Sequence, residues 1–318
     1  MFSADAGRWL WPALAAAVSV LLFLAPWLVP MVGIAASVGS PAPVVWQYRQ
    51  RGLNAGRLSL GLAILGAWLI NALSDVGGGW VYYLFYAALA LGLGEAMARR
   101  LPETWALGLA ALAAVAMLLA VTLGGALLGG HDLDQAWRAY WSREVDTALG
   151  LYAGQADLEA GRVDEVRQVL IGAGRWLYHL APGVLGAGAL LMAWANLLLL
   201  RSIAARREPQ APRQDLTSWR TPEPLVWVLI LAGAVVWAAD GLLFWVGVNL
   251  VVVLGVVYFF QGLAVMAYWL EKKNAPKLLR YGLYLLIAVE IFLAVGVALA
   301  GLFDLWFNFR RLGKEPSA

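Results

Sequence analysis

The chain has 318 residues, of which 62% are apolar and only 14% are charged, with a net charge of +3. An ordinary soluble domain has about 25% charged residues and a disordered chain is poor in apolar residues, so both classes are excluded. The absence of cysteine excludes disulfide scaffolds, thiolate metal sites and cysteine nucleophiles. The composition therefore predicts an all-α, polytopic transmembrane helix bundle.

Apolar runs of about 20 residues, the length that crosses about 30 Å of hydrocarbon, define the expected spans. The opening stretch is interrupted by Pro26, Pro30, Pro41 and Pro43. We expect a full span over 9–29 and, over 31–46, a half-span, a re-entrant piece or a second short crossing. The later spans are expected at 56–74, 79–98, 104–128, 176–200, 224–239, 242–270 and 279–303. The sequence thus predicts eight spans, or nine if residues 9–46 form a hairpin.

Arginine and lysine gather in alternate loops, which orients the bundle because basic loops stay in the cytoplasm. The basic loops fall within 49–57, 99–100, 201–222 and 272–280, whereas 74–79 and 240–241 carry no positive charge. We therefore expect a multi-pass membrane protein whose basic loops are cytoplasmic. By the same count of spans the C-terminal tail with Lys314 lies outside the cytoplasm, although the rule places basic segments inside. Either one segment does not cross the membrane or the tail is an exception to the rule.

Residues 131–175 form the longest polar segment, with five arginines and eight acidic residues. Apolar residues from Leu133 to Tyr152 recur with helical spacing, and a second helical pattern starts after Gly161. We expect an extracytoplasmic connector or, alternatively, a lid over the bundle. It divides N-terminal spans in 1–130 from C-terminal spans in 176–318, which include the basic cytoplasmic linker 201–222. The alternating charges form no basic patch, so we expect no nucleic acid partner.

A few polar side chains fall within the expected spans, and these are the candidate ligand-binding residues. Glu290 lies near the middle of the last span without a basic residue near it in that helix. It is either a substrate, cation or proton site, or a neutral carboxyl that bonds a neighbouring helix. Asn71, Asn196, Asn249 and Gln261 are amides in other spans. Each alone would join two helices by a hydrogen bond, but together with Glu290 they could line one polar cavity.

The remaining charged and histidine residues point to structure rather than chemistry. Glu95 and Arg99 lie one turn apart, which predicts a structural ion pair. His131 and His179 flank the polar segment and could approach each other in a haem or metal site, although two interfacial histidines are usually just solvated. The zinc-helix, nucleophile-elbow and phosphate-loop motifs are missing. We therefore expect no enzyme activity, no cofactor and no bound metal.

The C-terminal third carries motifs that resemble the YybS-like family of bacterial inner-membrane proteins. These motifs are Asn249-Leu250, Tyr258-Phe259-Phe260-Gln261-Gly262-Leu263-Ala264, and Gly301-Leu302-Phe303-Asp304 with Trp306 and Phe309-Arg310-Arg311. The Pro-rich stretch from Pro41 to Gly52 and the run Leu180-Ala181-Pro182 fit the same layout. The family is distantly similar to the S components of energy-coupling-factor transporters, which implies a substrate-binding bundle with an ATPase-driven partner.

The end of the last helix is expected to anchor the chain at the headgroup level. Asp304, Trp306, Arg310 and Arg311 gather there, and aromatic and cationic groups favour that depth. A contact of Asp304 with Arg310 or Arg311 would fix this helix end.

Two functions remain open from the sequence. The first is a small-molecule-binding or transport-associated bundle, with a polar cavity that contains Glu290. The second is a non-catalytic scaffold or assembly subunit with membrane protein partners. Both functions place the protein in the lipid bilayer. A third and less favoured function is a membrane enzyme that uses Glu290 or the two histidines.

Overall fold

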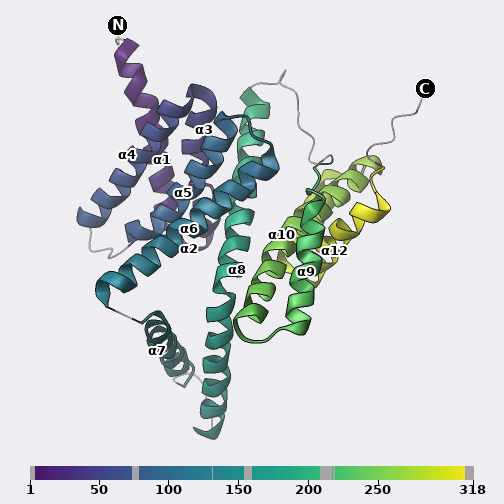
Figure 1. Cartoon of the computed structure of the whole chain (residues 1–318). Helices are drawn as coiled ribbons and strands as arrows, with labels where there is room; N and C mark the ends of the chain where they lie inside the picture. Colours follow the sequence, from purple (N-terminus) through teal and green to yellow (C-terminus); the bar gives the residue numbers. More distant parts are fainter. Residues whose placement is uncertain are drawn as a thin grey trace.

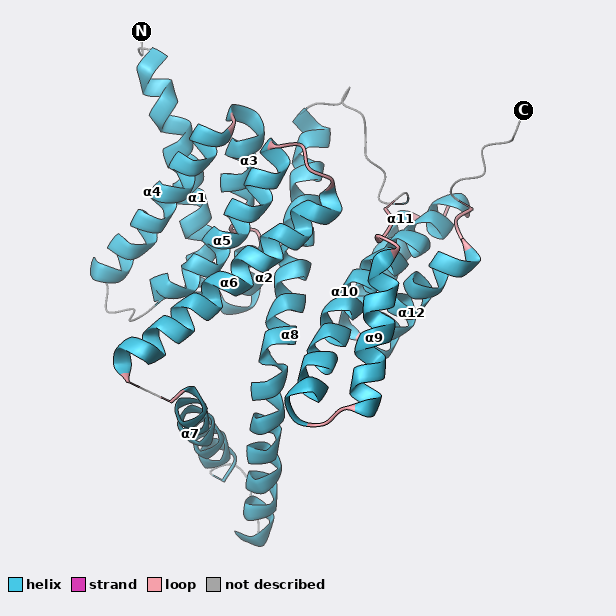
Figure 2. Cartoon of the chain, viewed as in Figure 1, coloured by secondary structure: helices cyan, strands magenta, loops and turns pink. Residues whose placement is uncertain are grey.

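The computed structural model describes residues 4–73, 79–130, 132–153, 160–207, 217 and 219–311, and every regular element in these ranges is helical (Figure 2). Two groups of helices lie on either side of the long α8 (Figure 1). The helices are α1 (Ala4–Leu28), α2 (Pro30–Val38), α3 (Ala42–Arg51), α4 (Leu53–Leu73), α5 (Gly79–Ala98), α6 (Glu103–Gly129), α7 (Leu133–Ala153), α8 (Ala160–Arg207), α9 (Pro224–Ala238), α10 (Gly241–Lys272), α11 (Lys277–Val289) and α12 (Ile291–Phe307).

The number of spans is smaller than the sequence predicts. Within the described residues six helices are long and apolar enough to cross a membrane, namely α1, α4, α5, α6, α8 and α10. The pair α11–α12 would make a seventh, but it bends by 106° at Glu290. The predicted eight or nine spans are therefore not confirmed. The differences fall on three segments, because 31–46 and 279–303 are each broken into two helices and α9 has only 15 residues.

Helices α2 and α3 together run back along α1. The Ser19 hydroxyl near the middle of α1 donates to the Ser40 carbonyl at 2.7 Å. Further along, the Arg51 guanidinium lies 5.4 Å from the centre of the Trp11 ring. These two contacts define an antiparallel register, so the chain returns through 31–46 towards the end at which α1 begins. The return segment is discontinuous, because the backbone leaves the helix at Gly39 and Ser40.

The first group of helices has a core of small residues and aromatic rings. Ala106, Ala110 and Ala114 form a buried stripe on α6, and small residues let helix backbones approach closely. The Tyr48 ring of α3 lies between Gly56 of α4 and Gly94 of α5, where an added Cβ would come within 2.2 and 2.4 Å of the ring. These contacts fix α3, α4 and α5 as one unit.

Helix α8 is one continuous element of 48 residues, about 72 Å long at 1.5 Å per residue. The domain boundary expected between residues 175 and 176 falls inside it. Its N-terminal part carries α7, since Trp137 Nε1 donates to Gly174 O at 2.9 Å and Trp141 Nε1 donates to Leu170 O at 2.8 Å. In Figure 1, α7 lies beside the projecting end of α8. Helix α7 is therefore held against the N-terminal part of α8.

Both ends of the α11–α12 pair lie towards the same end of α10. Four residues separate the end of α10 from the start of α11, and Arg280 donates to the carbonyl of Leu270 at 3.3 Å. After α12, Arg310 donates to the carbonyls of Thr217 and Trp219 at 2.6 and 2.8 Å, in the linker that joins α8 to α9. This geometry favours a re-entrant pair. It also removes the conflict with the charge rule, because it puts the end of α12 on the side of the basic linker.

Candidate functional site

A buried polar cluster joins α10, α12 and the linker before α9. Arg310 donates through Nη2 and Nε to Asp304 Oδ2 at 2.7 and 3.1 Å. Gln261 donates to the same oxygen at 3.3 Å and accepts the Thr221 N–H at 3.0 Å. The side chains of Arg310 and Asp304 are 0% and 5% exposed. We call Gln261, Asp304, Arg310 and Thr221 the polar node.

The polar node exists because α10 and α12 come into backbone contact. A Cβ added at Gly262 would lie 1.8 Å from Val297 O, and one added at Gly301 would lie 2.1 Å from Tyr258 O. Only glycine allows this approach. The two glycines therefore bring Gln261 and Asp304, their neighbours on each helix, within hydrogen-bond reach.

Several polar atoms around the polar node have no hydrogen-bond partner among the described residues. They are Asp304 Oδ1, Thr221 Oγ1, Trp219 Nε1 and Tyr258 OH, and all are buried. An unpaired buried donor or acceptor costs about 1–3 kcal/mol, so such atoms are expected to meet water or another ligand. Two of these atoms, Thr221 Oγ1 and Trp219 Nε1, belong to the linker itself and are two residues apart in the sequence.

A cavity of about 380 Å³ lies next to the polar node, between α8, α10, α11 and Trp219. Its wall is almost entirely apolar. Trp194 stacks on Phe260 with the ring centres 4.7 Å apart, and Trp219 meets Phe260 edge-on at 6.2 Å. From α11 the wall receives Tyr284, Ile287 and Ala288, and from α10 it receives Leu263, Ala264 and Ala267. Thus a cavity suited to an apolar molecule adjoins a group of unpaired polar atoms.

The candidate amides do not meet in one place. Asn196 of α8 donates to Val38 O at 2.8 Å and so caps the carbonyl at the end of α2. Close to that break, the buried hydroxyls of Ser19 and Tyr83 lie 2.8 Å apart. Asn71 lies near the end of α4, and its Oδ1 is buried without a described partner. Only Gln261 belongs to the polar node.

Asn249 repairs a gap in the backbone ladder of α8. Proline at 182 has no N–H and disturbs the hydrogen bonds of the preceding turn. The Asn249 side chain accepts the Gly183 N–H and donates to the His179 carbonyl at 2.8 Å. It therefore occupies the place between two backbone groups that would otherwise bond each other. The amide joins α10 to α8, and His179 itself stacks on Trp245 with centres 4.6 Å apart.

Glu290 is the residue at which the last apolar segment breaks. Its backbone is extended, with φ −97° and ψ 108°, and it ends α11 and precedes α12. The side chain is exposed and lines none of the described cavities. The structure therefore does not bring Glu290 together with the four amides.

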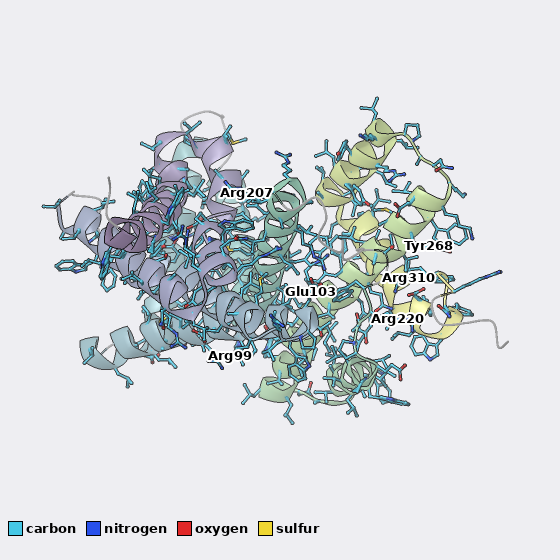
Figure 3. The ribbon with its side chains drawn as sticks, turned by 90° about the horizontal axis from the view of Figure 1, so that it is seen from above. Arg99, Glu103, Arg207, Arg220, Tyr268 and Arg310 are labelled. Atoms are coloured by element: carbon cyan, nitrogen blue, oxygen red, sulfur yellow. The ribbon has the colours of Figure 1, made fainter. Side chains whose placement is uncertain are left out.

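The charged pairs near the basic loops are ion pairs between helices. Glu95 accepts from Arg57 Nε at 2.7 Å and from Arg99 Nη2 at 2.8 Å, so the pair expected within α5 extends to α4. Glu103 of α6 pairs with Arg201 of α8, and seen from above Glu103 lies between the two groups of helices (Figure 3). His131 lies outside the described residues, so the two histidines cannot be compared.

Sequence reasoning expected Arg310 to anchor the end of the last helix, and in the structure its side chain is buried. Of the two contacts expected for Asp304, the one with Arg310 is present, whereas Trp306 and Arg311 are exposed. Arg220 and Arg310 lie close together in Figure 3, on the side of the second group of helices. The partners Thr217 and Trp219 lie 93 and 91 residues before Arg310 in the sequence, so no local pattern could have indicated them.

The fold and this site define a polytopic helical membrane protein with two discontinuous segments and a buried polar node. The chain belongs to the family described as "Predicted membrane protein (DUF2232)", whose model matches residues 17–305. This match confirms the YybS-like membrane family, while the likeness to energy-coupling-factor components stays a prediction. No curated protein and no solved structure matches the chain.

Proposed function

We propose that this membrane protein binds a small, largely apolar molecule in the cavity between α8, α10 and α11. The observation that carries the proposal is the cavity itself. Its volume of about 380 Å³ falls within the range of roughly 300–1,000 Å³ that is typical of ligand sites, which are mostly apolar with a few polar groups. The lining by Trp194, Trp219 and Phe260 suits an aromatic, isoprenoid or acyl group.

The polar end of the ligand is indicated by Trp219. Its indole N–H is buried, has no partner among the described residues, and belongs to a side chain that lines the cavity. Indole N–H is a donor only. A ligand with a carbonyl, ether or hydroxyl oxygen at one end would satisfy this donor, which favours an amphipathic molecule over a pure hydrocarbon.

Helix α11 offers a route of entry from the membrane. Among the described helices it packs closely only against α12, and a hydrogen bond from Arg280 to Leu270 O joins it to α10. One face carries Tyr284, Ile287 and Ala288 into the cavity wall, whereas Leu278 and Leu285 on other faces are 85% and 67% exposed. A weakly held wall helix next to a bend is the element that can move to admit a ligand. This supports a binding or transport-associated role over a sealed core.

The test is native mass spectrometry of the protein released from membranes in polymer nanodiscs. Wild type is expected to carry a bound molecule of a few hundred daltons. Ala264→Phe places a ring in the cavity and should remove that molecule, and the milder Ala267→Leu should weaken its binding. Ala116→Phe, at an exposed position of α6, is the matched control and should retain it. A wild type free of any bound molecule, or equal loading of all three variants, contradicts the proposal.

The arm formed by α7 and the start of α8 supports the alternative of a scaffold subunit. Apolar side chains remain exposed along it, with Tyr140 at 53%, Val166 at 47% and Val169 at 71%, and such side chains favour protein contacts. Gly174→Val would displace Trp141, whose ring lies 2.2 Å from an added Cβ. A scaffold should then lose its partners in gentle detergent, whereas a ligand-binding bundle should keep its bound molecule.

A further inference from the structure

A second cavity, of about 720 Å³, opens at the basic end of the first group of helices. It is formed where α3 ends, α4 begins and α5 ends. Arg49, Arg51 and Arg100 line it, together with Tyr48, Leu53 and Asn54. The cavity is separate from the one between α8, α10 and α11, since the two have no lining residue in common.

The lining is cationic and contains no acidic residue. The nearest carboxylate on α5, that of Glu95, is held by Arg57 at 2.7 Å and by Arg99 at 2.8 Å, so its charge is offset by two cations. Three arginines therefore border one space, and no acidic residue belongs to its lining. Guanidinium groups bind phosphate through paired N–H donors.

The start of α4 adds backbone donors to the same space. The first intrahelical bond is from Gly56 N to Gly52 O, so the N–H groups of Leu53 and Asn54 have no partner within the helix. Such groups and the helix dipole favour an anion at a helix N-terminus. Gly52, with φ +82°, makes the turn that lets α4 start here directly after α3.

Tyr48 also belongs to the lining of this cavity and is 1% exposed. Its hydroxyl is enclosed and has no hydrogen-bond partner among the described residues. The site thus combines three arginines with the backbone N–H groups at the start of α4 around one space.

The depth of the cavity favours a lipid as the source of the anion. Arg51 lies 5.4 Å from the Trp11 ring centre, and Arg49 lies 5.5 Å from that of Trp46. Tryptophan and arginine occur together at the level of lipid headgroups, and basic pockets between membrane helices bind anionic headgroups. We propose that this cavity binds the phosphate group of an anionic membrane lipid.

The experiment compares lipids and a free anion on the purified full chain in detergent. Short-chain phosphatidylglycerol, short-chain phosphatidylcholine and inorganic phosphate are added separately, and binding is followed by native mass spectrometry. Wild type should bind phosphatidylglycerol about 10-fold more tightly than phosphatidylcholine. The double variant R51A/R100A should lose this preference. Arg143→Ala, on α7 away from the cavity, should keep it, and thermal unfolding without lipid checks that each variant is folded.

Each outcome decides the proposal. Arginine-dependent binding of phosphatidylglycerol supports it. Arginine-dependent binding of inorganic phosphate alone supports a phosphate site but overturns its assignment to a lipid. Equal binding by wild type and by folded R51A/R100A in every arm overturns the site itself. If R51A/R100A does not fold, Arg51→Lys with Arg100→Lys keeps the charges and should still lower affinity, because paired donation is lost.

Discussion

Arg310 and Asp304 form an ion pair with a 2.7 Å contact, in which both side chains are almost fully buried. The pair closes the end of α12 against the linker between α8 and α9. Removing one partner of a buried pair leaves an uncompensated charge, which costs about 3–5 kcal/mol.

We expect Asp304→Ala and Arg310→Met each to lower thermal stability strongly, as measured by unfolding in detergent. The double variant should be less destabilised than the sum of the two, because it leaves no lone charge. Arg99→Met, which removes a more exposed partner of Glu95, serves as the comparison and should cost less than about 1 kcal/mol. Additive losses in the double variant would mean that the pair is not coupled.

The contact of α10 with α12 depends on Gly301. Gly301→Val places side-chain atoms where Tyr258 O lies 2.1 Å from the Cβ, so the helices must separate, and we expect a loss of about 1–3 kcal/mol or more. Gly296→Val, in the same helix but with open space around its Cβ, carries the same change of helix propensity. Thermal unfolding of the two variants should differ clearly, and similar melting temperatures would contradict this packing.

Asn249 should matter only while Pro182 interrupts α8. Asn249→Leu leaves the Gly183 N–H and the His179 carbonyl without their side-chain partners, and we expect a loss of about 1–2 kcal/mol. Pro182→Ala allows the normal ladder to form, so Asn249→Leu should cost much less in that background. The four melting temperatures of this cycle give the coupling between the two residues.

The re-entrant geometry of α11–α12 predicts which residues share a side of the membrane. The chain contains no cysteine, so single cysteines can be introduced without further changes. Arg220→Cys and Arg311→Cys should react with an impermeant maleimide from one side, and Asp240→Cys from the other. Labelling of Arg311→Cys together with Asp240→Cys would show that the pair crosses the membrane as one span.

The sequence predicts α4, α5 and α6 closely, because each is one uninterrupted apolar run between charged or glycine-rich turns. The expected ranges 56–74, 79–98 and 104–128 differ by at most three residues from the ends of the helices in the structure. In such runs the length of the hydrocarbon core decides the length of the helix. Tertiary contacts therefore shift the ends of these three helices by only a few residues.

The breaks were harder to predict, because their cause is tertiary. Residues 279–303 read as one apolar span, and no proline marks the bend at Glu290. The carboxylate within that run was recognised as unusual, but its position suggested a buried group rather than an exposed corner. Arg310 is the converse case. A cation after the last helix usually lies at the surface, and here two carbonyls and Asp304 draw it inside.

The cavities had no signal in the sequence. Ala264 and Trp194 are 70 residues apart in the chain, and each fits an ordinary apolar span. The fold alone brings these residues into one cavity wall, in which Phe260 stacks on Trp194 and meets Trp219 edge-on. By contrast, the family motif around Gln261 and Gly262 did mark the node, because a glycine beside an amide is the combination that close helix contact requires.

The discontinuous return of α2 and α3 has a consequence for how the protein is made. These helices have 9 and 10 residues, about half the length that a translocon recognises as a free-standing span. Neither half can partition into lipid by itself, since the carbonyls of Val38 and Ser40 at the break need side-chain partners. Ser19 supplies one of them. The first helix must therefore act as a template, and residues 4–51 should enter the bilayer as a single cotranslational hairpin.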